Sequence, residues 1–168
     1  LVVFGSVSLE ALGRDDAGVK AVRYLPNGTL DPTFGTNGIV SFRLAGSNNR
    51  FFGGAVFQSS TDPNRDKLLL VGNGNGGPVV VRLNVDGSLD SSFGPNGQGW
   101  IETSQSNLVG VAIYNSGPDV GKFAVLLNVE YGGAAGFGGT ATTILRYLEG
   151  GQIDTTFGNN GQFAFRFN

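Results

Sequence analysis

Three aspartates recur in this chain at the same distance from an arginine, and their carboxylates are the first candidates for chemistry. The pairs, each eight residues apart, are Arg23 and Asp31, Arg82 and Asp90, and Arg146 and Asp154. An arginine can hold a carboxylate through charge-assisted hydrogen bonds, so we expect pairing inside each unit or between neighbouring units. The alternative is that the three aspartates form metal or sugar sites. Calcium normally collects about six to eight oxygens, and each copy offers one or two carboxylates, so we expect a structural role, no metal and no cofactor.

Glycoside hydrolysis is the one hydrolytic chemistry that the composition leaves open. The chain has neither His nor Cys, which excludes the Ser-His-Asp and Cys-His arrangements and the usual zinc ligand sets. A glycosidase needs two carboxyl groups about 5 to 10 Å apart. The candidates outside the recurring pairs are Glu10, Asp15, Asp16, Asp62, Asp66, Glu102, Asp119, Glu130 and Glu149. Several lie in turn-like settings, where solvated carboxylates are typical, so we expect no enzyme, with a carbohydrate hydrolase as the alternative.

The composition also argues against nucleic acid and against membrane insertion. The formal net charge is -2 and the 11 basic residues are scattered singly, so no basic stripe is available to follow a phosphate backbone. No apolar run approaches the roughly 20 residues that span a bilayer. The glycine-rich stretch 72–77 is followed by Pro78 and a β-branched run instead of a helix, which predicts a hairpin loop and not a phosphate site.

The recurring pairs belong to a longer motif that occurs three times, at residues 23–38, 82–97 and 146–161. The copies align without a gap, at offsets of 59 and 64 residues. Each contains a turn glycine, Leu or Ile before the aspartate, a Phe-Gly pair and a final Asn-Gly. The Phe-Gly pairs are Phe34 and Gly35, Phe93 and Gly94, and Phe157 and Gly158. We expect the aspartate to lock a turn by accepting backbone hydrogen bonds, the phenylalanine to be buried between units, and the glycines to let the backbone bend.

Eleven short apolar or alternating segments lie around these motifs, and none sustains a helical period. They are residues 1–4, 20–24, 39–44, 54–58, 67–71, 79–83, 100–102, 108–114, 122–127 and 143–148, with a last one starting at residue 162. With 29 Gly and 14% charged residues, they predict an all-β protein with four strands per repeat unit, grouped as two, four, four and one. We expect a β-propeller-like array of four-stranded antiparallel blades, about three blade equivalents, with incomplete blades at both termini.

The motif resembles the delta-60 repeat, a bacterial family with a β-propeller domain of unknown function. The resemblance is carried by Arg82-Leu83-Asn84-Val85-Asp86-Gly87-Ser88-Leu89-Asp90-Ser91-Ser92-Phe93-Gly94, whereas the third copy departs with Glu149-Gly150-Gly151-Gln152-Ile153. It implies a propeller that occurs often in large secreted or surface proteins. It implies no catalytic residue.

Function is expected in the features that differ between units. Insertions at residues 6–18 and 129–142 lengthen two of the units, and the second carries Tyr131 and Phe137 in a glycine-rich setting suited to a partner or a sugar.

We interpret residues 1–168, which start and end inside apolar runs, as one repeat domain that is a processed product or a piece of a longer protein. We therefore predict a non-enzymatic scaffold or binding module that pairs through strand edges at residues 1–4 and 162–167, and the resemblance implies that it is secreted or at the cell surface. Its partners are other copies or neighbouring repeats, and the alternative is a carbohydrate-binding or carbohydrate-hydrolysing propeller.

Overall fold

Apart from one short 3₁₀ turn, the regular secondary structure of the described residues is β-strand, as the sequence predicts. The computed structural model describes residues 2–7, 18–42, 44, 50–74, 77–103, 107–131 and 139–166. Within these ranges the elements are β1 (Val2–Val7), β2 (Gly18–Arg23), β3 (Ile39–Phe42), β4 (Arg50–Val56), β5 (Leu68–Gly74), β6 (Gly77–Leu83), the short 3₁₀ turn η2 (Pro95–Gly97), β7 (Trp100–Glu102), β8 (Leu108–Ile113), β9 (Phe123–Tyr131), β10 (Gly139–Tyr147) and β11 (Gln162–Arg166). None of the helical structure found in these ranges has the length and apolar character of a membrane span.

The strands form three antiparallel sheets, which we call blades. Blade 1 has the order β1-β2-β3, blade 2 the order β4-β5-β6-β7, and blade 3 the order β8-β9-β10-β11. About three antiparallel blades were expected, but the predicted grouping of two, four, four and one strands is corrected to three, four and four. Each motif reverses the chain, because the Arg82 N–H donates to the Gly99 carbonyl at 3.0 Å and β7 returns beside β6. The strand that follows a motif therefore belongs to the same blade as the strand before the motif, and β11 is the fourth strand of blade 3.

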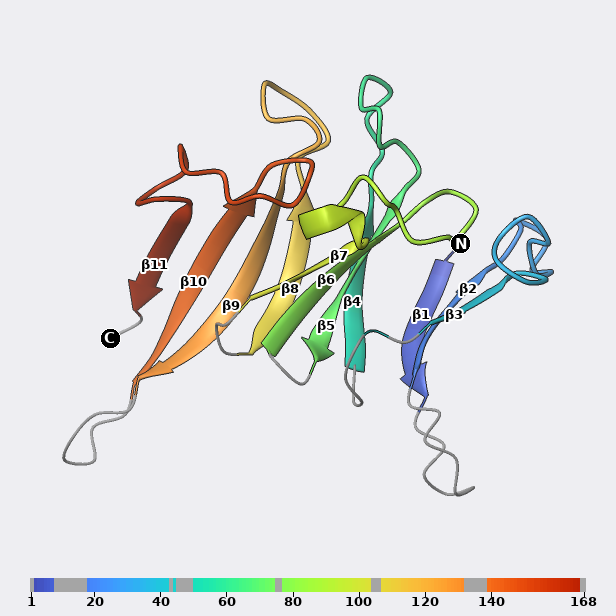
Figure 1. Ribbon diagram of the computed structural model, residues 1–168, viewed down its shortest axis with the longest axis horizontal. Coiled ribbons are helices and arrows are strands. Elements are labelled where there is room, and N and C mark those ends of the chain that lie inside the picture. The colour runs from blue at the N-terminus through green and yellow to red at the C-terminus, as the bar shows by residue number, and fades with distance from the viewer. Residues whose placement is uncertain are drawn as a thin grey trace.

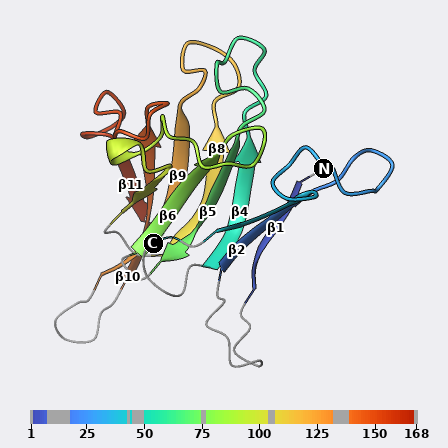
Figure 2. The ribbon, with the colours of Figure 1, turned by 45° about the vertical axis from the view of Figure 1, so that its right-hand side comes forward.

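The blades stack face to face, with blade 2 between the other two (Figure 1). Their first strands approach most closely, β1 to β4 and β4 to β8, and the later strands splay apart like a fan (Figure 2). Two apolar cores fill the two spaces between blades. On β5, Leu68 and Leu70 belong to the core shared with blade 1, whereas Leu69 and Val71 belong to the core shared with blade 3. Because side chains alternate along a strand, this continuous apolar run marks a strand buried on both faces.

The longer of the two predicted insertions is partly regular structure. β9 and β10 extend into residues 129–142, and Tyr131 pairs with Gly139 at the end of this hairpin. Phe137 lies outside the residues that the structure describes, as does most of the insertion at residues 6–18. The proposed roles of both insertions stay predictions.

Candidate functional site, the joint between blades

The arginine and the aspartate of each motif meet inside their own blade. The distances from arginine Nε to aspartate Oδ2 are 2.8 Å for Arg23 and Asp31, 2.6 Å for Arg82 and Asp90, and 2.9 Å for Arg146 and Asp154. The third pair is an ion pair without hydrogen-bond geometry at Nε. Of the two pairings considered from the sequence, the aspartate therefore pairs within its own unit.

The other oxygen of each aspartate holds a turn. Asp90 Oδ1 accepts hydrogen bonds from the Ser92 backbone N–H at 2.9 Å and from the Ser92 hydroxyl at 2.7 Å. Asp31 and Asp154 make the same two contacts with Thr33 and Thr156. Such Asx turns follow from a short carboxylate two residues before a free N–H.

A lysine that the sequence reading missed completes two of the sites. Lys67 Nζ lies 2.7 Å from Asp90 Oδ2, and Lys122 Nζ lies 2.9 Å from Asp154 Oδ2. Both lysines immediately precede the second strand of their blade, β5 or β9. This shared position in two repeat units was the signal by which the sequence could have identified them as part of the site. Burial alone would raise the pKa of Asp90, but hydrogen bonds from Lys67 and Ser92 outweigh it and hold that pKa well below its usual range. Hydrogen bonds from Thr156 and Lys122 lower the pKa of Asp154 in the same way.

These carboxylates are expected to make the fold acid-sensitive. Because the folded pKa values of Asp90 and Asp154 lie below the ordinary value of 3.8, their contribution to stability is fully present above about pH 5 and is lost as the pH falls through 4 and below. Urea midpoints measured from pH 7 to pH 2 should fall across this window. The Asp90→Asn variant should be less stable at pH 7 and show a shallower decline, and an unchanged pH slope would contradict the assignment.

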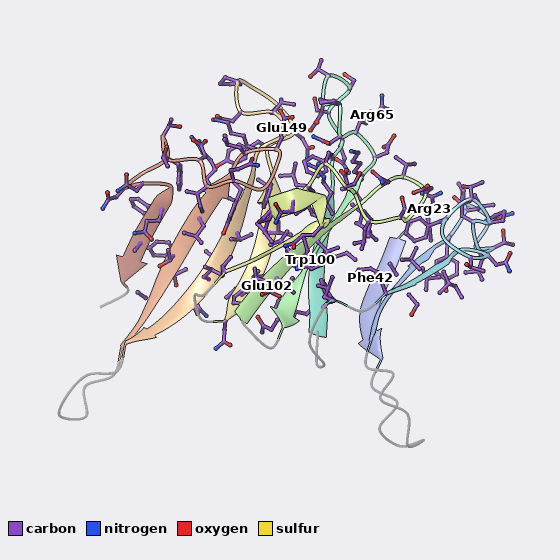
Figure 3. The ribbon with its side chains drawn as sticks, viewed as in Figure 1. Arg23, Phe42, Arg65, Trp100, Glu102 and Glu149 are labelled. Carbon is purple, nitrogen blue, oxygen red and sulfur yellow. The ribbon has the colours of Figure 1, made fainter. Side chains whose placement is uncertain are left out.

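The guanidinium of each of the first two motifs also reaches into the next blade. Arg82 Nη1 donates to the backbone carbonyl of Glu149 in blade 3 at 2.5 Å, and Arg23 Nη1 donates to the carbonyl of Val85 in blade 2. Figure 3 shows Arg23 at the end of blade 1, on the side of blade 2. The same guanidinium lies over the phenylalanine of its own motif, with 4.7 Å from Cζ to the ring centre for both Arg23 over Phe34 and Arg82 over Phe93.

A second contact joins the same two surfaces. The Gly35 N–H donates to the Asp86 carbonyl at 2.7 Å, and the Gly94 N–H donates to the Gly150 carbonyl at 3.0 Å. We call the arginine, phenylalanine and following glycine of a motif its socket, and the four-residue turn at 25–28, 84–87 or 148–151 its plug. The plug of blade 2 lies in the socket of blade 1, and the plug of blade 3 lies in the socket of blade 2.

Close approach explains why the plugs of blades 2 and 3 end in glycine. A Cβ at Gly87 would lie 2.4 Å from Val40 and 3.0 Å from the Phe34 ring, and Gly87 has φ of 88°. At Gly151, φ is 89° and a Cβ would lie 3.0 Å from Ile101. A residue with a side chain would be strained at these angles and would hold the blades apart.

The Gly94→Ala substitution is expected to destabilise the protein by about 2 to 3 kcal/mol. Gly94 has φ of 81°, and an added Cβ would lie 2.1 Å from the Trp100 carbonyl oxygen, so both conformation and space oppose it. The matched control is Gly117→Ala, since Gly117 has φ of 79° and nothing within 4 Å of the Cβ position. Urea denaturation should show a clearly larger loss for the first variant, and equal losses would rule out the steric explanation.

Of the remaining candidate carboxylates, Glu10, Asp15 and Asp16 lie outside the described residues, the side chain of Glu130 is not described, and the others form no acidic cluster. Asp119 contacts Lys122 and Arg146, and Asp66 lies 3.7 Å from Arg65. Across the described ranges, no group of three or more acidic residues could hold a metal ion together. Tyr131 ends β9 by backbone pairing, and Phe137 is not described.

The sheets and joints define a β-propeller array: antiparallel blades stack around their first strands, and one repeated joint links each to the next. The chain is similar to the family described as "Domain of unknown function (DUF5122) beta-propeller" at residues 18–34 and 66–93. These segments hold β2 with the first part of the first motif, and β5 and β6 with the second motif up to Phe93. No curated protein and no solved structure matches the chain.

Proposed function

We propose that this chain is a non-enzymatic scaffold or binding module, secreted or at the cell surface, whose blades assemble with other copies or with neighbouring repeats of a longer parent. The observation that carries this proposal is that both joints are made by the same contacts. In each, the arginine Nη1 and the glycine N–H of one blade donate to backbone carbonyls in the turn of the next blade. A joint that repeats without change can link further blades of the same kind. Resemblance to the delta-60 repeat supports the extracellular location.

The polar side chains of the motif are already engaged in hydrogen bonds within the protein, which supports a structural role for them. Both oxygens of Asp90 accept hydrogen bonds from protein groups, and Arg82 uses Nε, Nη1 and Nη2 in contacts within the joint. A carboxylate saturated in this way has no oxygen left to serve as a nucleophile, a proton donor or a metal ligand.

Strand edges supply one further route to assembly. β1 is an edge strand of blade 1, and β11 is an edge strand of blade 3. The outer backbone groups of an edge strand favour pairing with another strand. Sedimentation velocity of the chain across a wide concentration range should therefore show reversible self-association. A monomer at every concentration, with full stability, would overturn the proposed self-assembly.

A hollow between blades 2 and 3 favours carbohydrate binding as a second candidate function. Its volume is about 470 Å³, and its polar lining includes Glu102, Thr103, Asn160 and Gln162. Tyr147 also lines this hollow, and burial raises its pKa to about 12. Glycan-array binding that is lost in Glu102→Gln would support this function, and turnover of a bound glycan would indicate a hydrolase.

A further inference from the structure

Blade 3 carries a complete socket that receives no plug within the described part of the chain. Arg146 Cζ lies 4.7 Å from the centre of the Phe157 ring, the same distance as in the two filled sockets. The glycine of this socket, Gly158, has φ of 55°, close to the 56° of Gly35. The parts of the third socket are thus arranged like those of the first.

The donors of the third socket lack the acceptors that the other two have. Among the described residues, no carbonyl accepts from the Gly158 N–H, whereas the equivalent Gly35 and Gly94 donate at 2.7 and 3.0 Å. Arg146 Nη1 lies 3.3 Å from Asp119 Oδ2, a long hydrogen bond that replaces the 2.5 Å contact between Arg82 and a backbone carbonyl. Because each terminal guanidinium nitrogen carries two hydrogens, Arg146 can still donate to a further acceptor.

The face of blade 3 beside this socket matches a face that is buried in blade 2. Leu126 pairs with Ile144 on β9 and β10 as Val71 pairs with Val80 on β5 and β6. Val71 and Val80 are fully buried under blade 3. In blade 3, Leu126 and Ile144 instead line an apolar hollow of about 290 Å³.

The contrast is sharpest at the last strand. Phe163 pairs with Ile144 on β10 as Ile101 pairs with Val80 on β6. Ile101 is 5% exposed, whereas Phe163 is 53% exposed. An apolar side chain that is buried at one joint is therefore uncovered at the equivalent position beside the third socket.

Blade 1 presents the matching plug. The Leu25 N–H donates to the Thr29 carbonyl at 2.8 Å, as the Asn84 N–H donates to that of Ser88 at the same distance. Gly28 has φ of 83°, but nothing lies within 4 Å of its Cβ position, whereas Gly87 is packed against blade 1. The first plug has the conformation of the two inserted plugs and lies in open space.

We infer that the plug of blade 1 inserts into the socket of blade 3 of a second copy of this chain. By equivalence with the two internal joints, the Asn27 carbonyl accepts from the Gly158 N–H and the Pro26 carbonyl accepts from Arg146 Nη1. The interface is heterologous, so it propagates head to tail until the blades close a ring or form an open array. This inference rests on the proposed assembly function and names the surface that carries it.

The test uses one variant on each side of the interface. Phe163→Asp places a charge against the incoming plug, and Phe52→Asp is its control, because Phe52 is 48% exposed on β4 outside the socket. Gly28→Ala adds a Cβ that meets no atom in the monomer, where its cost is the strain of φ of 83°, and that collides in the joint. Circular dichroism and urea midpoints identify variants that fold like the parent chain.

Sedimentation velocity then separates the outcomes. The parent chain and Phe52→Asp should associate alike, and Phe163→Asp and Gly28→Ala should each raise the dissociation constant at least about tenfold, or about 1.4 kcal/mol. A mixture of Phe163→Asp and Gly28→Ala should restore dimers that grow no further, since one variant keeps its plug and the other its socket. Association that survives in Phe163→Asp, or a mixture without dimers, would overturn the head-to-tail joint and leave assembly through strand edges. A parent chain that never associates would overturn both.

Discussion

Replacing Arg82 with methionine is expected to lower the free energy of unfolding by about 3 to 5 kcal/mol, because it breaks a buried charge cluster by removing one partner. The Arg82 side chain is 2% exposed and pairs with Asp90 at 2.6 Å. Its loss leaves the Asp90 carboxylate with Lys67 as its remaining cation. It also removes the donor to Glu149 and the cation over Phe93. Blade 2 would lose an internal ion pair and one of its hydrogen bonds to blade 3 in one step.

The third motif offers a matched control for this substitution. Arg146 has the same neighbours within its motif, but its side chain is 12% exposed and its guanidinium donates to no backbone carbonyl within the described ranges. We therefore expect Arg146→Met to cost clearly less than Arg82→Met in urea denaturation followed by circular dichroism. Equal losses for the two variants would show that the contact between blades contributes nothing.

The second large effect is expected for Phe93→Ala, at about 3 to 5 kcal/mol. Phe93 is fully buried, and its ring centre lies 5.8 Å from that of Phe123 in blade 3. Phe123 in turn stacks on Tyr147 with 5.1 Å between ring centres. Truncation would empty the centre of the core between blades 2 and 3 and would remove the support beneath the Arg82 guanidinium.

Phe157→Ala is the control for the phenylalanine position. Phe157 has the same place in its motif and the same arginine above it, but it is only partly buried at the uncovered face of blade 3. In dilute solution, where the third socket is empty, we expect this variant to lose about 1 kcal/mol or less. A loss as large as that of Phe93→Ala would mean that phenylalanine acts within its blade and not between blades.

Local features of the motif followed from the sequence because neighbouring residues decide them. An aspartate two residues before a free N–H closes its own turn, as Asp90 does with Ser92. An Asn-Gly pair tolerates positive φ, and Asn96 adopts φ of 57°. The spacing of eight residues between Arg82 and Asp90 also anticipated their pairing, because the chain reverses between them and the Asp90 N–H donates to the Arg82 carbonyl.

Other parts of the site needed partners that lie far away in the chain. The Arg82 acceptor is a backbone carbonyl 67 residues later, and a carbonyl carries no residue-type signal. Lys67 reaches Asp90 only because β5 lies beside β6 in the same sheet. The grouping of strands into blades was wrong for a related reason, since each sheet starts one strand later than the repeat unit predicted from the sequence.

The sequence by itself determined that this protein repeats, that its units are made of antiparallel strands, and that an aspartate, a phenylalanine and glycines organise the turn in each motif. Those properties depend on local conformational preference and on alternation along a strand, which are written in adjacent residues. Only the tertiary structure decided which face of a blade is covered. Phe34, Phe93 and Phe157 are the same residue in the same motif, yet the first two are buried and the third is not, because burial depends on whether a following blade is present to supply the plug.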